Sequence, residues 1–167
     1  MTSIYEEIEN SIITRLAPLA SAGVDVVLLP ENEADFTKPN SKPRITVMYY
    51  TSKFGGSMDS NLARLRSIGI SSQEESIMLE VTMQSRKLRG TAGIMQIFEA
   101  VKDLLYGFAP ADCDKLYLSE FNMLKKDKSD ATWAFAATFL CSRLQAEKDS
   151  NEVVQRITKL TFDYENI

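Results

Sequence analysis

An apolar stripe between residues 94 and 108 constrains the fold of this chain more than any other feature of its sequence. Its members recur at three- and four-residue spacing, and they are Ile94, Ile97, Phe98, Val101, Leu104, Leu105 and Phe108. This pattern predicts an amphipathic helix, whose apolar face must be buried against another element. Thr91 is the predicted N-cap, Gly107 is the predicted left-handed residue after the last turn, and Pro110 prevents continuation. Gly93, inside the predicted first turn, should weaken the helix by about 1 kcal/mol relative to alanine.

The other periodic segments predict one further helix and five strands. Apolar residues recur at every fourth position from Ile4 to Leu16, and Pro18 closes this first helix. Strands are predicted over residues 24–29, 44–53, 77–88, 115–125 and 131–144. The polar residues 126–130 form the turn of a hairpin between the last two strands. The order of a helix, three strands, a helix and a hairpin predicts an α+β domain, with two amphipathic helices on one face of a mainly antiparallel β-sheet.

Two of these strands show which of their faces should be buried. Leu79, Val81 and Met83 alternate with polar residues, which is the pattern of a strand with one face toward the core. In the last strand, the residues expected to point one way are Trp133, Phe135, Ala137, Phe139 and Cys141. Trp133 is therefore expected to be a core or sheet-face aromatic, not a platform for stacking a ligand.

The length of 167 residues fits a single domain, residues 1–167, with its core at about residues 3–146. Residues 31–43 contain proline, asparagine and serine and are predicted to be a surface loop. The helix and strand signals weaken over residues 54–76, which we treat as a loop excursion. Loops of this length are usually binding segments or disordered segments. Residues 147–167 form a C-terminal arm that is compatible with a helix, an edge strand or a partner-bound segment.

The residue types point away from metal and acid–base chemistry. The chain contains no histidine, which is the commonest general base at neutral pH and the commonest metal ligand. Its two cysteines are too few for a four-thiolate zinc site. We expect Cys141 to be a small buried group on a strand and Cys113 to be a loop thiol. The sequence therefore predicts no metal, no cofactor and no enzymatic activity.

Charge and hydropathy limit the partners as well. A formal net charge of −4 disfavours general nucleic-acid binding, which depends on Lys and Arg at phosphates, and no sequence-specific nucleic-acid partner is expected. Every apolar run is shorter than the roughly 20 residues that cross a bilayer, and residues 1–7 lack the pattern of a signal peptide. We therefore expect synthesis in the cytoplasm and no membrane partner.

Two local patterns have a functional interpretation beside a structural one. Arg86–Gly93 places basic residues and glycines ahead of a helix N-terminus, which is a geometry that can bind an anion. It lacks the phosphate-loop lysine and the full dinucleotide glycine spacing, so a plain strand-to-helix connection is the simpler interpretation. Glu6, Glu7 and Glu9 resemble paired carboxylates, but acidic residues near a helix start are favoured by the helix dipole.

The packing and turn residues of this chain resemble a known family. The segments concerned are Pro43-Arg44-Ile45-Thr46-Val47, Arg89-Gly90, Gly93, Leu104-Leu105-Tyr106-Gly107-Phe108-Ala109-Pro110 and Trp133-Ala134-Phe135. Their order along the chain is similar to that of the Mu-type phage tail proteins related to tail terminators. The resemblance covers roughly Ile4 to Leu144. The excursion over residues 54–76 and the C-terminal arm depart from the family pattern.

The resemblance implies a small α+β fold and a structural role in a virion. Tail terminators form a hexameric ring on the last layer of the tail tube, stop tube polymerisation and present a surface to the neck. The implied partners are further copies of this chain, the tail tube protein, a neck or connector protein and, in a contractile tail, the sheath protein. The implied location is the tail and neck of the virion, after assembly in the host cytoplasm.

A ring of this kind closes through head-to-tail contacts, so each subunit needs two different complementary patches. The candidate contact residues are Met58, Leu62, Leu65, Lys125, Lys126, Asp127, Lys128 and Asp130, and residues 31–43 are a further candidate segment. Extension of a neighbour's sheet through an unpaired edge is one physical route for such a contact. A solvated turn is the structural interpretation of the charged hairpin tip.

Two other functions stay open at this point. Another neck component, such as a stopper or a head-tail completion protein, fits the same features. A small anion- or nucleotide-binding domain centred on Arg86–Gly93 belongs to a different class. Its signature would be thermal stabilisation by nucleotides or phosphate, because a ligand that binds only the folded state raises the melting temperature.

Overall fold

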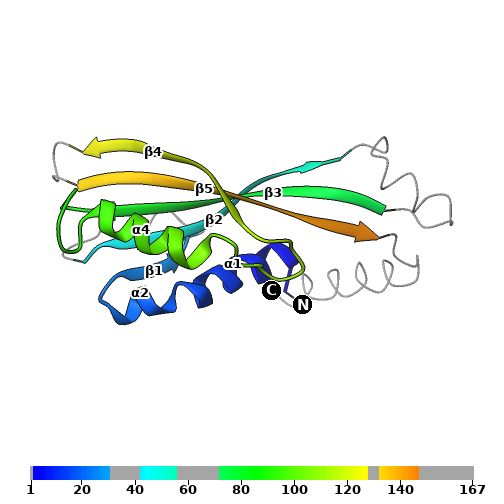
Figure 1. Cartoon of the computed structure of the whole chain (residues 1–167), viewed down its shortest axis with the longest axis horizontal. Helices are drawn as coiled ribbons and strands as arrows, with labels where there is room; N and C mark the ends of the chain where they lie inside the picture. Colours follow the sequence, from blue (N-terminus) through cyan, green and yellow to red (C-terminus); the bar gives the residue numbers. More distant parts are fainter. Residues whose placement is uncertain (1, 31–41, 56–71, 128–131, 147–167) are drawn as a thin grey trace, which may run out of the picture. The chain divides into compact units, whose positions relative to one another are not determined.

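The computed structural model describes residues 2–30, 42–55, 72–127 and 132–146. The elements in chain order are α1 (Ile4–Arg15), α2 (Ala17–Ser21), β1 (Asp25–Leu28), β2 (Arg44–Phe54), β3 (Ser72–Ser85), α4 (Ile94–Leu105), β4 (Tyr117–Asp127) and β5 (Thr132–Ala146). The described strands form one sheet in the order β1-β2-β3-β5-β4 (Figure 1). β1 runs parallel to β2, and β4 runs antiparallel to β5. The predicted α+β class with a mainly antiparallel sheet is confirmed.

The contacts within the chain group it into two compact units. The first is Met1–Lys53 with Glu75–Arg143, and the second is Phe54–Glu74 with Leu144–Ile167. In the second unit, the Gly55 N–H donates a 2.7 Å hydrogen bond to the Glu74 carbonyl. The single domain expected from the sequence stays a prediction.

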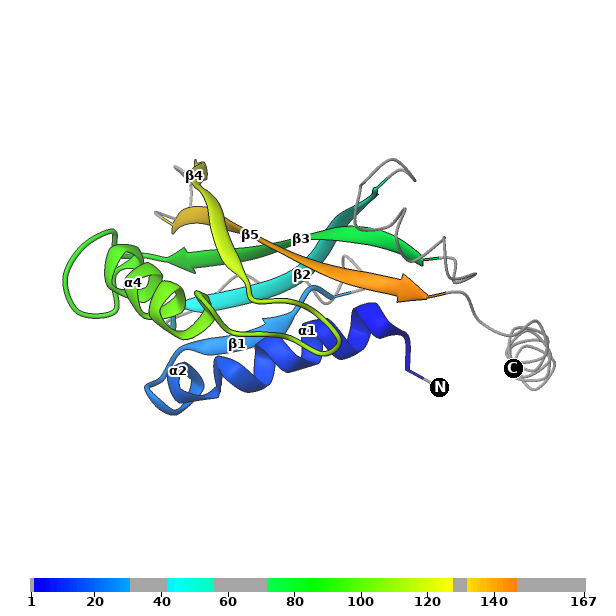
Figure 2. The ribbon, with the colours of Figure 1, turned by 45° about the vertical axis from the view of Figure 1, so that its right-hand side comes forward.

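The core of the first unit lies where the helices cover one face of the sheet. Figures 1 and 2 show α1, α2 and α4 on the same side of the strands. Ile8 and Ile12 of α1, together with Ile97 and Val101 of α4, are buried in this core. The sheet contributes a larger set to it, namely Ile45, Val47, Ile77, Leu79, Val81, Met83, Ala137, Phe139 and Cys141. The apolar stripe predicted for the long helix therefore has the partner that its pattern requires.

The buried faces predicted for two strands are confirmed. Leu79, Val81 and Met83 are fully buried on β3, so the alternating pattern identified the inner face correctly. On β5, the predicted inner residues all belong to the core or pack against it, and they are Trp133, Phe135, Ala137, Phe139 and Cys141.

The first helix ends differently from the sequence prediction. α1 stops at Arg15, and a short second helix, α2, starts at Ala17 with Pro18 in its first turn. Proline is tolerated there because the first N–H groups of a helix have no intrahelical acceptor. The prediction that Pro18 closes the helical segment was therefore wrong. Gly23, at φ 92°, then makes the left-handed turn into β1.

The start of α4 also corrects the sequence analysis. Gly93 is the N-cap, at φ −78° and ψ 154°, so Thr91 does not cap the helix and Gly93 is not inside it. A Cβ placed on Gly93 would lie 2.6 Å from the Arg89 carbonyl carbon, so glycine permits a close approach of backbone to backbone. At the other end, Gly107 has the predicted left-handed conformation, with φ 76°. Phe108 lies beyond the helix and still packs against the core.

The boundaries of all five described strands differ from the prediction by one residue or more, most of all in β3. β3 begins at Ser72 and ends at Ser85, so residues 72–76, assigned to the excursion, are strand, whereas residues 86–88 are not. β4 continues to Asp127, so residues 126 and 127, predicted as turn, are paired with β5. The hairpin itself is confirmed by the antiparallel register of β4 and β5.

Candidate functional site

The predicted contact residues lie mostly outside the described part of the chain. Met58, Leu62 and Leu65 of the excursion fall there, and so do Lys128, Asp130 and nearly all of the loop over residues 31–43. The backbones of Lys125, Lys126 and Asp127 are at the end of β4, where they pair with Ala134, Trp133 and Thr132 of β5. The structure therefore places three of the predicted residues together at the end of one hairpin. Their role in contacts stays a prediction.

The segment Arg86–Gly93 is a closed connection between β3 and α4. The N–H groups of Ile94 and Met95, the first two residues of the helix, donate to the carbonyls of Lys87 and Leu88 at 3.0 and 3.2 Å. The Ala92 N–H donates to Gln96 Oε1 at 3.2 Å. An anion at a helix N-terminus binds through such N–H groups, and here they already have acceptors. This geometry favours the structural interpretation of the segment.

Two acidic residues of α1, Glu6 and Glu9, have structural roles. Ser3 and Glu6 form a reciprocal capping box, in which Ser3 Oγ accepts from the Glu6 N–H and Glu6 Oε2 accepts from the Ser3 N–H. Glu9 Oε1 accepts a 2.7 Å hydrogen bond from the Tyr49 N–H of β2. The pairing of β2 with β1 ends at Val47, so β1 does not reach Tyr49. Helix α1 therefore supplies the hydrogen-bond acceptor for the Tyr49 N–H.

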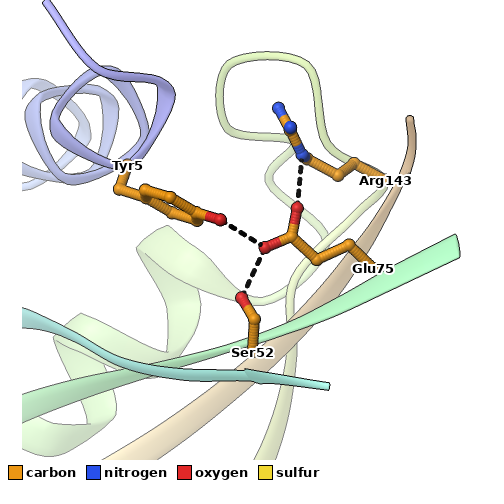
Figure 3. A network of polar contacts seen from close by, with 4 residues as sticks. All are labelled: Tyr5, Ser52, Glu75 and Arg143. Atoms are coloured by element: carbon orange, nitrogen blue, oxygen red, sulfur yellow. Dashed lines mark hydrogen bonds and ion pairs between the residues drawn. The ribbon is translucent and has the colours of Figure 1, made fainter. Parts of the chain in front are cut away.

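A polar cluster of the first unit is centred on Glu75, a fully buried carboxylate on β3. Its Oε1 accepts hydrogen bonds from Tyr5 Oη at 2.9 Å and from Ser52 Oγ at 2.5 Å. Its Oε2 accepts from Arg143 Nε at 2.8 Å. Figure 3 shows these side chains converging from α1, β2, β3 and β5 onto one carboxylate. We call Tyr5, Ser52, Glu75 and Arg143 the Glu75 cluster.

The electrostatics of the cluster favour an ionised Glu75. Burial alone raises the pKa of a carboxyl, but the hydrogen bonds from Ser52, Arg143 and Tyr5 outweigh it and hold the pKa of Glu75 below its usual value. The pKa of Tyr5 is raised by burial and by its hydrogen bond to the Glu75 carboxylate. Because the carboxylate accepts hydrogen bonds from donors on three other elements, it holds those elements together. It is poorly suited to act as a base, because its pKa is lowered and three of its roughly four lone-pair sites already accept hydrogen bonds.

Sequence analysis missed this cluster, although one signal for it was present. Glu75 has the same strand parity as Ile77 and Leu79, so the alternating run places it on the buried face. The sequence prediction began this strand at residue 77 and therefore left Glu75 in a loop. The partners Tyr5 and Arg143 are 70 and 68 residues away in sequence, and no local pattern joins them.

A second feature is an open hollow between α4 and the start of β4, with a volume of about 600 Å³, whose lining includes Lys102, Asp103, Tyr106 and Leu118. Tyr106 is 67% exposed at its edge.

Farther along β4, Met123 and Leu124 are 56% and 52% exposed, beside the end of the hairpin. Exposed apolar side chains of this kind are common at sites of protein contact.

Residues 2–30, 42–55, 72–127 and 132–146 contain no group of three or more His, Cys, Asp or Glu side chains that could hold a metal ion. In the same part of the chain, no helix has the length and apolar content needed to cross a membrane.

Comparisons with known proteins give a family and a fold. A solved chain described as part of the "Virion of native gene transfer agent (GTA) particle" is similar to this one, with a TM-score of 0.55 and 11% sequence identity. The likeness covers 87% of this chain and 100% of that chain, and at this identity it shows a shared fold. A comparison with curated proteins gave no match. The family model described as "Gp37 protein" matches residues 12–166, which is most of the chain. This protein therefore belongs to the Gp37 protein family.

Proposed function

We propose that this protein is a structural component of a phage or phage-like virion, and specifically a tail terminator. In this role it forms a hexameric ring on the head-proximal end of the tail tube, stops tube polymerisation and connects the tail to the neck. The observation that carries the proposal is the fold shared with a chain of a gene transfer agent virion, over all of that chain and 87% of this one.

The resemblance to Mu-type tail proteins supports the same role. This support comes from the sequence and does not depend on the fold comparison. It rests on turn and packing positions, and the structure gives two of them a physical purpose. Gly93 allows the close approach of α4 to Arg89, and Gly107 has the left-handed conformation that ends the helix. Residues of this kind maintain a scaffold, which is what a ring subunit requires.

Subunit contacts in the proposed ring are formed through side chains rather than through sheet extension at β4. β4 is an edge of the described sheet, but its register is interrupted between Leu118 and Glu120 and again between Met123 and Lys125. Bulges of this kind discourage a neighbouring strand from pairing with an edge. The exposed Met123 and Leu124 precede the charged residues 125–130 in the sequence, and together these residues are one proposed contact patch.

The second patch must differ from the first, because a head-to-tail contact joins unlike surfaces. The hollow beside Tyr106 is the described surface that fits this requirement best, since it is concave and partly apolar. Met58, Leu62 and Leu65 of the excursion are further proposed contacts. Weak contacts of this type become cooperative when the tube end presents matching sites, so the ring can form on the tube from monomers.

The test of this assignment uses Met123→Glu, which places a charge in the first patch. Ser119→Glu, with the same added charge at an exposed position earlier on β4, is the matched control. Sedimentation of the chain with purified tail tubes should show tube-bound assemblies for the parent chain and for Ser119→Glu, and loss of binding for Met123→Glu. A parent chain that stays monomeric both alone and with tubes would contradict the proposal.

A further inference from the structure

The two cysteines of the chain lie together in the fold. Cys141 is on β5 and is 3% exposed, whereas Cys113 is half-buried in the connection between α4 and β4. A hydrogen bond joins their thiol groups. They are separated by 27 residues in the sequence, so this contact is produced by the hairpin fold. Both cysteines are free thiols.

The residues that follow the two cysteines are hydrogen-bonded to each other. The Asp114 N–H donates a 2.8 Å hydrogen bond to the Ser142 carbonyl, and Ser142 Oγ donates to Asp114 Oδ2 at 3.1 Å. These bonds join the residue after Cys113 to the residue after Cys141. Both bonds lie on the C-terminal side of the cysteines, and they hold together the two segments that carry the thiols.

We propose that Cys113 and Cys141 are a dithiol site that closes to a reversible intrachain disulfide in the presence of a low-molecular-weight disulfide such as oxidised glutathione. This inference does not depend on the proposed role in the tail. Its consequence is a covalent link between the α4–β4 connection and β5, next to Arg143 of the Glu75 cluster.

The two thiols have different roles because their environments differ. The hydrogen bond from Cys141, helped by the positive charge of Arg143, lowers the pKa of Cys113. The same hydrogen bond and burial raise the pKa of Cys141. Cys113 is also the more accessible of the two, so it is the group that meets an external disulfide first.

The chemistry has two exchange steps. The Cys113 thiolate attacks one sulfur of oxidised glutathione, forms a mixed disulfide and releases one glutathione thiolate. Cys141 then loses its proton to solvent or to that thiolate and attacks the Cys113 sulfur, releasing the second glutathione. In sum, two protein thiols are oxidised to one disulfide, and one glutathione disulfide is reduced to two thiols. The first step also removes the negative charge on Cys113 that opposes ionisation of Cys141.

The test treats the full chain, under native conditions, with oxidised glutathione and follows intact mass after alkylation in denaturant. The expected product has lost two hydrogen atoms, takes up no alkylating reagent and carries no glutathione. Dithiothreitol should return both thiols. The control variant Leu140→Cys/Cys141→Ser moves the strand thiol by one residue to the other face of β5, and closure should be slower by about tenfold or more.

Three outcomes would overturn the proposal. In the first, glutathione stays attached to Cys113 while Cys141 is alkylated after denaturation. In the second, oxidation gives only disulfide-linked dimers. In the third, both thiols remain reduced although oxidised glutathione modifies an unfolded control of the same chain. A Cys113→Ser variant adds a check, because its buried Cys141 should resist glutathione in the folded protein.

Discussion

Arg143 Nε donates a 2.8 Å hydrogen bond to Glu75 Oε2, which joins β5 to the neighbouring strand β3. The Glu75 side chain is fully buried and that of Arg143 is 13% exposed. The other oxygen of Glu75 accepts from Tyr5 and Ser52, so one carboxylate connects four elements. Forming such a buried ion pair and breaking it change the free energy of unfolding by different amounts. Removing one member leaves a buried charge without its partner, and this costs more than the pair contributes.

Glu75→Gln is therefore expected to destabilise the protein strongly. Glutamine keeps the shape of the side chain but leaves the Arg143 guanidinium without a counter-charge. Breaking a buried ion pair in this way costs roughly 3 kcal/mol or more. Urea unfolding followed by circular dichroism gives the difference directly. Glu120→Gln removes the same charge from an exposed position on β4, and its change should stay within about 0.5 kcal/mol.

The same cluster makes stability depend on acid pH. The folded-state pKa of Glu75 lies below its usual value of 4.5, so the unfolded chain binds this proton more readily than the folded chain does. The stabilisation is complete above pH 4.5 and is lost as the pH falls through the lower folded-state pKa. Urea midpoints measured between about pH 6 and pH 3 should fall less steeply in Glu75→Gln than in the parent chain. Parallel curves for the two proteins would contradict this assignment.

Gly93→Ala should destabilise the start of α4. The added Cβ meets backbone atoms of Arg89 at 2.6 to 2.8 Å, which requires a shift of the strand-to-helix connection. Overpacking of this size costs about 1–3 kcal/mol. Thr91→Ala is the informative comparison. Loss of a true N-cap costs about 1 kcal/mol, whereas the structure places the cap at Gly93 and predicts a change within about 0.5 kcal/mol.

An aromatic stack fixes the hairpin to the long helix. Phe121 of β4 stacks on Phe98 of α4, with ring centroids 3.6 Å apart, and on Phe135 of β5 at 5.2 Å. Phe121→Ala should lower the free energy of unfolding by about 3 kcal/mol, because it removes both ring contacts and leaves a cavity. Tyr117→Ala removes a 53% exposed aromatic from the same strand. A loss for Tyr117→Ala as large as that for Phe121→Ala would show that the stack has no special role.

Periodicity in the sequence was sufficient to predict the two long helices, the five described strands and the inner faces of α4, β3 and β5, but not the short helix α2. The stripe of the long helix and the alternation around Leu79 have a single physical interpretation each, burial on one face, and both were confirmed. Helix boundaries were less predictable where one residue type can either end or begin a helix. Pro18 can end a helix or start one, and which applies depends on the packing of the next segment.

The Glu75 cluster shows why the polar features were harder to predict. Its members come from four elements that only the completed sheet brings together, and each looks like an ordinary surface residue in its local sequence. Glu75 was detectable by strand parity alone, but its need for Arg143 and Tyr5 was not. The contact between Cys113 and Cys141 depends in the same way on the hairpin register.

The central claim, that this protein terminates a tail tube, is tested most directly by electron microscopy of assembling tails with and without the chain. Tube length and the head-proximal end are scored in each sample. The proposed function predicts tails of uniform length, capped by a six-fold ring, only when the protein is present. Tails of unchanged length distribution, with no ring at the head-proximal end, would contradict it.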